Sequence, residues 1–242
     1  MPDDIPISMT YLTPVARSDC HRLWYAVLAT VLFVLVALVQ GAVRPDYDAW
    51  HQSISALSLG PGGWVQDVAF AFLGIALLST VPVWRRALAD GVGARAYPVL
   101  IALTGISLIA AGWIPQDPAP GYDPELLGHT LPTITGLIHL GVAGVGALAS
   151  SIALFVMAAR FATLPDWLAW ATYSRVTGVL TIVCVVVYAV WSTHASGFAG
   201  TFERLVIVLP GAWGYAVVSR LSSGTPFVVS HAPKRVDAAT AA

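Results

Sequence analysis

The first group of residues that could do chemistry lies in the segment 44–57, between two apolar stretches. Asp48, His51 and Ser55 fall there at i, i+3 and i+7, so a helix over residues 48–57 would carry an acid, a base and a hydroxyl on one face. Asp48 is placed to orient His51 by accepting a ring N–H, and an oriented imidazole can activate a serine hydroxyl. The alternative interpretation gives Ser53 and Ser55 a structural role as helix caps.

A second group lies between residues 112 and 139. This stretch contains three acids, two histidines and no basic residue: Asp117, Asp123, Glu125, His129 and His139. Imidazole nitrogens and carboxylate oxygens are common ligands of divalent metals. A divalent metal is therefore the one cofactor that the sequence suggests. The closely spaced histidine pair of a zinc helix is missing, since His129 and His139 are ten residues apart, and the identity of any cofactor stays open.

His139 stands at the edge of an apolar stretch. An ionisable group at a membrane boundary usually faces the bundle interior and has a partner. Two interpretations follow: a neutral histidine bonded to Thr133 or Thr135, or a functional group. The candidate catalytic residues are His51, Asp117, His129 and His139. The candidate substrate-binding residues are Asp48, Ser53, Ser55 and Trp113.

Three further polar residues have simpler interpretations. Asp67 precedes an apolar stretch and is expected to cap a helix, where the helix dipole favours a carboxylate. His194 and Glu203 are expected to be solvated in the last connecting segment. These three residues are therefore left outside the candidate site.

The elements that must position the candidate residues are apolar helices. The chain of 242 residues is 57% hydrophobic and 10% charged, whereas soluble domains are about 25% charged. About 20 apolar residues in a helix cross the hydrocarbon core of a bilayer. Six uncharged runs approach this length, at 23–43, 68–84, 97–114, 137–159, 176–191 and 205–218. We predict an all-α fold, a polytopic transmembrane bundle of six helices, with a cytoplasmic segment over 1–22, the transmembrane domain over 23–218 and a disordered cytoplasmic tail over 219–242.

The distribution of basic residues predicts an orientation. Ten of the twelve Lys and Arg residues lie before the first run, after the last one, or in the second and fourth connections. Only Arg44 and Arg204 lie on the other side. Because positive charge is retained on the cytoplasmic side, both termini are expected in the cytoplasm of a multi-pass protein of the cell membrane. The basic residues are explained as membrane flanks, so nucleic acid is not an expected partner.

Small residues predict how the helices pack. Lipid does not drive apolar helices together as water does. Small residues let two helix backbones approach closely, so they indicate where helices contact one another. Ala143, Ala147 and Ser151 recur every four residues in the fourth run, and Gly146 and Ser150 lie on a neighbouring stripe. This pattern predicts that the fourth helix stands at the centre of the bundle.

Several short motifs resemble a known family. They are His51-Gln-Ser-Ile-Ser-Ala-Leu, Phe72-Leu-Gly-Ile-Ala-Leu and Gly112-Trp-Ile-Pro-Gln-Asp, followed by His129 and His139. Together they are similar to the bacterial membrane family known as domain of unknown function 998, in which Phe is usual at the position of Ile114. The resemblance covers roughly residues 23–218. It implies six transmembrane helices and a recurring external polar cluster, with no established activity.

Three classes of function fit these observations. The first is a membrane enzyme, a hydrolase or a cyclase, whose external Asp and His residues act on a lipidic or isoprenoid substrate. In the cyclase version Asp117 or Asp67 would be the acid, kept protonated by a dry pocket. The second is a non-catalytic membrane subunit or sensor that binds a metal or a partner. The third is a small-molecule transporter, although runs two to six lack a mid-membrane acid for ion coupling.

Overall fold

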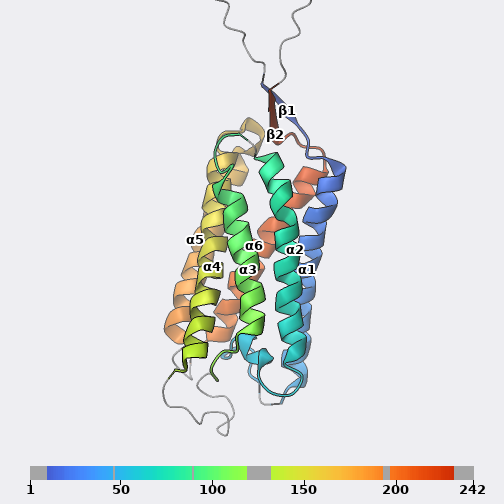
Figure 1. The fold of residues 1–242 in the computed structure, drawn as a ribbon. Helices are drawn as coiled ribbons and strands as arrows, with labels where there is room; N and C mark the ends of the chain where they lie inside the picture. The colour runs from blue at the N-terminus through green and yellow to red at the C-terminus, as the bar shows by residue number, and fades with distance from the viewer. Residues whose placement is uncertain (1–9, 46, 89, 119–131, 193–196, 232–242) are drawn as a thin grey trace, which may run out of the picture.

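The computed structural model describes residues 10–45, 47–88, 90–118, 132–192 and 197–231. Within them, six long α-helices lie roughly along one axis (Figure 1): α1 (Arg17–Val43), α2 (Trp64–Ala87), α3 (Ala96–Trp113), α4 (Ile134–Phe161), α5 (Leu168–Trp191) and α6 (Ala199–Ser222). Each is long and apolar enough to cross a membrane. The predicted six apolar helices are confirmed, and their length and composition are those of a multi-pass membrane protein. Most helices extend past the predicted runs.

The six helices form a closed ring. Each helix contacts its neighbours in sequence, and α6 returns to contact α1. The expectation that α4 stands at the centre is therefore wrong, because α4 lies in the ring between α3 and α5. Of its small residues, Gly146 contacts Ser107 of α3, where an added Cβ would lie 2.7 Å from the serine Cβ.

Glycines also bring α2 and α3 close together. A Cβ added to Gly74 would lie 2.5 Å from the carbonyl oxygen of Gly105. A Cβ added to Gly105 would lie 2.8 Å from the carbonyl oxygen of Gly74. Such close backbone approach is how small residues hold transmembrane helices together without a hydrophobic driving force.

Two short strands mark one end of the bundle, the terminal end. The strand β1 (Thr10–Thr13) pairs antiparallel with β2 (Val228–His231). Just before β2, Phe227 is fully buried and packs on Trp84 and Trp167. The chain was expected to be disordered from residue 219 onward, but α6 continues to Ser222 and residues 225–231 return over the terminal end. Residues 232–242 lie outside the described part of the chain.

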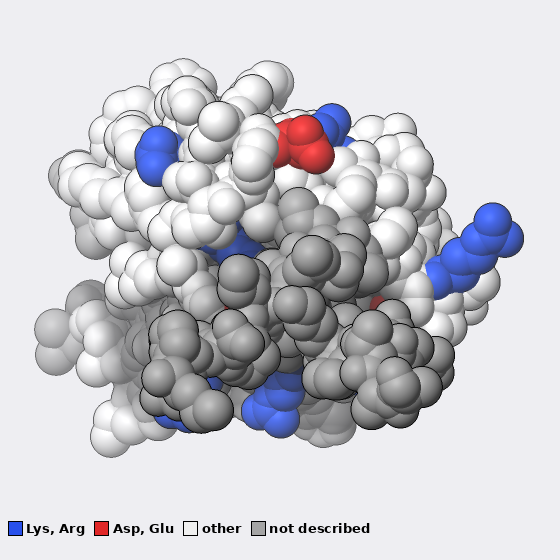
Figure 2. Space-filling model, turned by 90° about the horizontal axis from the view of Figure 1, so that it is seen from above, with Lys and Arg blue, Asp and Glu red and all other residues white. Residues whose placement is uncertain are grey.

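The terminal end carries most of the described basic residues. Seen from above Figure 1, this end shows more blue Lys and Arg surface than red Asp and Glu surface (Figure 2). One acid is paired there, because Arg86 donates to Asp19 over 2.5 and 3.2 Å. At the opposite end, the loop end, the described residues include the short 3₁₀ helix η1 (Ile54–Ser58) and the first turns of α4 and α6. A second short 3₁₀ helix, η2 (Pro165–Trp167), precedes α5.

Candidate functional site: the loop end and the central lumen

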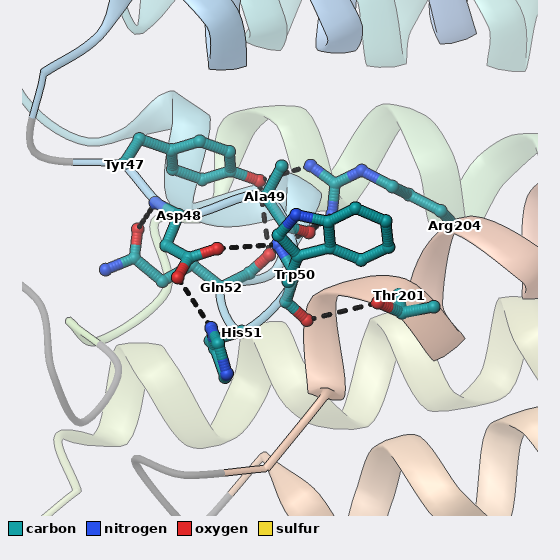
Figure 3. Close-up of polar contacts among 8 residues, drawn as sticks. All are labelled: Tyr47, Asp48, Ala49, Trp50, His51, Gln52, Thr201 and Arg204. Atoms are coloured by element: carbon teal, nitrogen blue, oxygen red, sulfur yellow. Dashed lines mark hydrogen bonds and ion pairs between the residues drawn. The ribbon is translucent and has the colours of Figure 1, made fainter.

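Asp48 and His51 form a close pair at the loop end. The Nδ1 atom of His51 lies 2.6 Å from Oδ2 of Asp48 (Figure 3). Partial burial raises the pKa of the Asp48 carboxyl, but hydrogen bonds from the Trp50 amide and the His51 ring outweigh it, so this pKa lies below its ordinary value. An ionised aspartate can only accept, so Nδ1 of His51 is the donor of this contact. In the neutral ring, Nε2 is then the nitrogen with the free lone pair. The predicted orientation of His51 by Asp48 is confirmed.

The hydroxyl predicted to join this pair points elsewhere. Residues 49–52 form turns and only Ile54–Ser58 are helical, so the helix expected over 48–57 is not continuous. Ser53 is the N-cap of η1 and accepts from the Ala56 amide, as the capping interpretation predicted. Ser55 is buried and lines a cavity inside the ring of helices. Within the described residues, the His51 ring instead stacks on Phe198 at a centroid distance of 5.1 Å.

Arg204 holds the segment that carries this pair. Its guanidinium donates to the carbonyl oxygens of Ala49, Gln52 and Gly200, at 2.7, 3.3 and 2.8 Å. It also donates to the Tyr47 hydroxyl over 2.6 Å (Figure 3). Burial raises the pKa of that hydroxyl to about 12, although Arg204 opposes the shift. Arg204 therefore acts as a clamp between α6 and the segment before η1.

Arg44 has the same kind of role. It donates to the carbonyl oxygen of Leu57 over 2.7 Å and also to that of Leu59. Because the guanidinium has donors in a fixed fork, one arginine can satisfy several carbonyl groups of an irregular segment. The two basic residues predicted on this side thus have structural partners in the backbone of residues 49–59.

Glu203 is the functional candidate that the sequence interpretation missed. It belongs to the first turn and a half of α6 rather than to a solvated segment. Its carboxylate accepts from the amides of Ile54 and Ser55 at the start of η1, and its side chain lines the cavity. The expectation that Glu203 is solvated is wrong. One signal was available, because an ionisable residue beside the last apolar run usually faces a bundle interior.

Asp117 and His139 meet at the start of α4. Asp117 accepts from the amide and the hydroxyl of Thr133, at 2.9 and 2.7 Å. A Cβ on Gly136 would lie 2.0 Å from Oδ2 of Asp117, so the carboxylate needs glycine there. Thr133 in turn caps α4 by accepting from the Gly136 amide. Asp117 therefore has a structural role at the N-terminal end of α4, where it binds the capping residue Thr133. This role does not depend on any role in catalysis.

His139 is buried but has a different partner from the one expected. Its side chain is 5% exposed, and Nδ1 donates to the carbonyl oxygen of Ile114 over 2.6 Å, not to Thr133 or Thr135. Asp117 lies close enough to interact with it electrostatically. Gln116, the residue before Asp117, connects this region to the segment that carries Asp48 and His51. The Ser53 hydroxyl donates to its Oε1 over 3.0 Å.

The remaining predicted residues do not complete one cluster. Trp113 is 79% exposed at the end of α3, as expected of an interface tryptophan. Asp67 lies in the first turn of α2, where Gly63 is the N-cap. His129, with Asp123 and Glu125, and His194 lie outside the described residues. Within the described residues no group of three His, Cys, Asp or Glu side chains could hold a metal ion.

The ring of helices encloses a central cavity of about 290 Å³, the lumen. All six helices and Ser55 of η1 contribute to its wall. Most of that wall is apolar, and among its described residues Glu203 is the one with a charged side chain. The small residues Ala143, Ala147 and Ser150 of α4 face this space. Of the stripe that predicted a central helix, Ala143 and Ala147 therefore line the lumen, whereas the third residue, Ser151, does not.

Comparison with known proteins gives a family and no closer relative. No curated protein and no solved structure matches the chain. A family model described as a protein of unknown function (DUF998) matches residues 27–220, a range that covers all but the first turns of α1 and the last residues of α6. The resemblance seen in the motifs is thus confirmed, and the chain belongs to the DUF998 family of proteins of unknown function.

Proposed function

We propose that this protein binds a lipidic or isoprenoid molecule in the lumen, with the polar end of the molecule at Glu203. The observation that carries the proposal is a cavity of about 290 Å³ whose apolar wall ends in one carboxylate. Small-molecule sites typically enclose about 300–1,000 Å³ and combine an apolar wall with a few polar groups. Lipidic molecules of this kind are available to a protein that lies in a bilayer.

The proposal also assigns the chemistry that such a site would support. A carboxyl group at the edge of an apolar pocket can serve as a general acid or base. In an enzyme of this type Glu203 would exchange the proton, in place of the acids first considered, Asp117 and Asp67. Neither of these lines the lumen.

Two glycines of α4 allow a matched test. A Cβ on Gly144 or on Gly141 would meet nothing within 4 Å, but Gly144 lines the lumen while Gly141 is exposed on the outer face. Gly144→Leu should fill part of the lumen, and Gly141→Leu should only add surface toward lipid. Lipids that copurify with each variant can be counted by mass spectrometry after exchange into nanodiscs.

The expected result is a stoichiometric copurified lipid in the wild type and in Gly141→Leu, and its loss in Gly144→Leu. Equal lipid content in all three samples would refute binding in the lumen. Thermal unfolding of the two variants provides the control, because both should fold as well as the wild type.

A second candidate function rests on Asp48 and His51. The 2.6 Å contact between Nδ1 and the carboxylate leaves Nε2 as a base, and the imidazole is partly exposed, at 34%. This arrangement suits a general base for hydrolysis at the loop end. The test is release of product from lipid esters by the wild type and by His51→Gln, and equal rates would exclude it.

A further inference from the structure

We propose that lipidic ligands enter the lumen laterally from the bilayer, through a groove between α1 and α6. This inference rests on the proposed function and adds the route by which the ligand reaches its site. The groove lies on the lipid-facing side of the ring of helices, and one side chain, Ile207, separates it from the lumen. The occupant of the groove is a hydrocarbon chain from the surrounding lipid.

The groove is a second cavity, of about 210 Å³. Leu38 of α1 and Val208 of α6, which line it, are 52% and 39% exposed and belong to helices that are apolar enough to span a membrane. The groove therefore opens toward lipid. Its apolar wall residues are Val34, Ala37, Leu38, Ile54, Ile207 and Val208. A wall of this composition suits a hydrocarbon chain.

The groove has a fixed border at each end. Toward the terminal end α1 and α6 touch, because a Cβ on Gly211 would lie 2.8 Å from Cγ2 of Thr30. Toward the loop end the border is Arg204, the remaining wall residue. Its terminal nitrogens donate to the carbonyl oxygen of Ala49 and to the hydroxyl of Tyr47. The groove thus opens into the half of the bilayer at the loop end, and its apolar side chains define what it binds.

Ile207 is the partition between the two cavities. Among the described residues it is the one that lines both. Its neighbour Val206 lines only the lumen, and its neighbour Val208 lines only the groove. A β-branched side chain has one strongly preferred rotamer in a helix. Ile207 therefore separates the cavities in the resting structure and has to be displaced for a ligand to pass.

The backbone of α6 is weakened beside this partition. Pro210 lies inside α6 and has no amide hydrogen, so the carbonyl group of Val206 loses its helical hydrogen bond. Proline is a common site of helix kinks for this reason. The part of α6 that carries Ile207 can therefore move relative to α1 with fewer helical bonds to restrain it.

The two ends of the lumen are less suitable entrances. At the loop end, η1 is held in place by the carboxylate of Glu203. At the terminal end, the rings of Trp84 and Tyr97 line the lumen with their centroids 5.0 Å apart, and the buried Phe227 packs on Trp84. A lipid that entered by either end would first have to expose its chain to water, whereas the groove keeps it in apolar surroundings.

The experiment measures how fast a probe reaches the lumen of the full chain in nanodiscs. The probe is a geraniol analogue with a diazirine group, an isoprenoid that is supplied from vesicles. Samples are irradiated at set times after mixing. Mass spectrometry then quantifies the label on residues that line only the lumen, such as Thr104 and Ala147.

The first variant removes the partition. Ile207→Ala should raise the rate of lumen labelling about tenfold, because the side chain that has to be displaced is gone. Ile101→Ala is the matched control, since Ile101 lines the lumen but not the groove. It adds the same space to the lumen without opening the wall, and its rate should stay close to that of the wild type.

The second variant blocks the groove. Val208→Trp fills it from the lipid side and should slow lumen labelling about tenfold. Val179→Trp is its control, because Val179 is exposed on α5 and lines neither cavity. Equal rates within either pair would overturn entry through the groove and leave lumen binding in place. Lumen labelling that cannot be saturated in the wild type, or that persists in Gly144→Leu, would instead refute the proposed function.

Discussion

The carboxylate of Glu203 accepts a hydrogen bond from the backbone amide of Ile54, although 149 residues separate the two in sequence. The contact joins α6 to the segment between α1 and α2 at the loop end and fixes η1 over one end of the lumen. A residue that lines the cavity thus also supports the segment that closes it. Structural and functional effects of Glu203 therefore have to be separated by the choice of substitution.

Glu203→Ala is expected to destabilise the protein by about 1–3 kcal/mol, because it leaves the Ile54 amide without its acceptor. Glu203→Gln should cost less, since the amide oxygen can still accept. Unfolding in detergent, followed by circular dichroism, measures both. Asp166→Ala is the control, because Asp166 is exposed at the terminal end. An alanine variant at 203 as stable as this control would contradict the capping role of Glu203.

Glycine-to-alanine substitutions are expected to have opposite signs at two positions. Gly74→Ala would place a Cβ 2.5 Å from the carbonyl oxygen of Gly105, and forcing the helices apart should cost about 1–3 kcal/mol. Gly214→Ala meets nothing within 4 Å and should stabilise α6 by up to about 1 kcal/mol. The same unfolding assay compares them. Equal effects would argue against close packing of α2 on α3.

The six helices could be predicted from sequence because lipid-facing and core-facing positions are both apolar. The predicted runs stopped at the first charge, whereas the helices do not. α1 begins at Arg17, and α4 passes Arg160 to end at Phe161. The side chain of Arg160 reaches the carbonyl oxygen of Asp90 over 2.8 Å. Such a bond to a distant backbone group is invisible in a hydropathy pattern.

The candidate site was only partly predictable, for a related reason. The pairing of Asp48 with His51 is local and follows from spacing alone. The contacts of Glu203 with Ile54 and of His139 with Ile114 join distant segments, and no spacing rule reports them. The small residues of α4 did not distinguish between two arrangements, because small side chains are found both where a neighbouring helix packs closely and where a helix borders a cavity.

The carboxyl group of Asp48 should titrate below its ordinary pKa of 3.8, because the Trp50 amide and the His51 ring stabilise its charged form. A carboxyl whose pKa is lowered by folding contributes stability that is complete above the ordinary value. That contribution is lost as pH falls through the lower value in the folded protein. Carbon NMR of labelled aspartate side chains follows this titration.

Removing the partner should reverse part of this shift. His51→Ala is expected to raise the pKa of Asp48 toward 3.8, since one hydrogen bond to the carboxylate and the attraction of the imidazole are lost. His21→Ala, an exposed site at the terminal end, is the control and should leave Asp48 unchanged. An unchanged Asp48 titration in His51→Ala would show that the ring does not hold the carboxylate.

The terminal end is expected to face the cytoplasm, because the Arg-bearing ends of the helices lie there and positive charge is retained on that side. A cysteine in place of Trp64, which is 68% exposed at the loop end, should react with an impermeant maleimide on intact cells. A cysteine in place of Val92, 43% exposed at the terminal end, should react only after lysis. Cys20 and Cys184, both buried free thiols, are replaced by serine beforehand so that only the new cysteine reports. The reverse labelling pattern would invert the orientation and place Glu203 at the cytoplasmic face, where a ligand would have to enter from the inner leaflet.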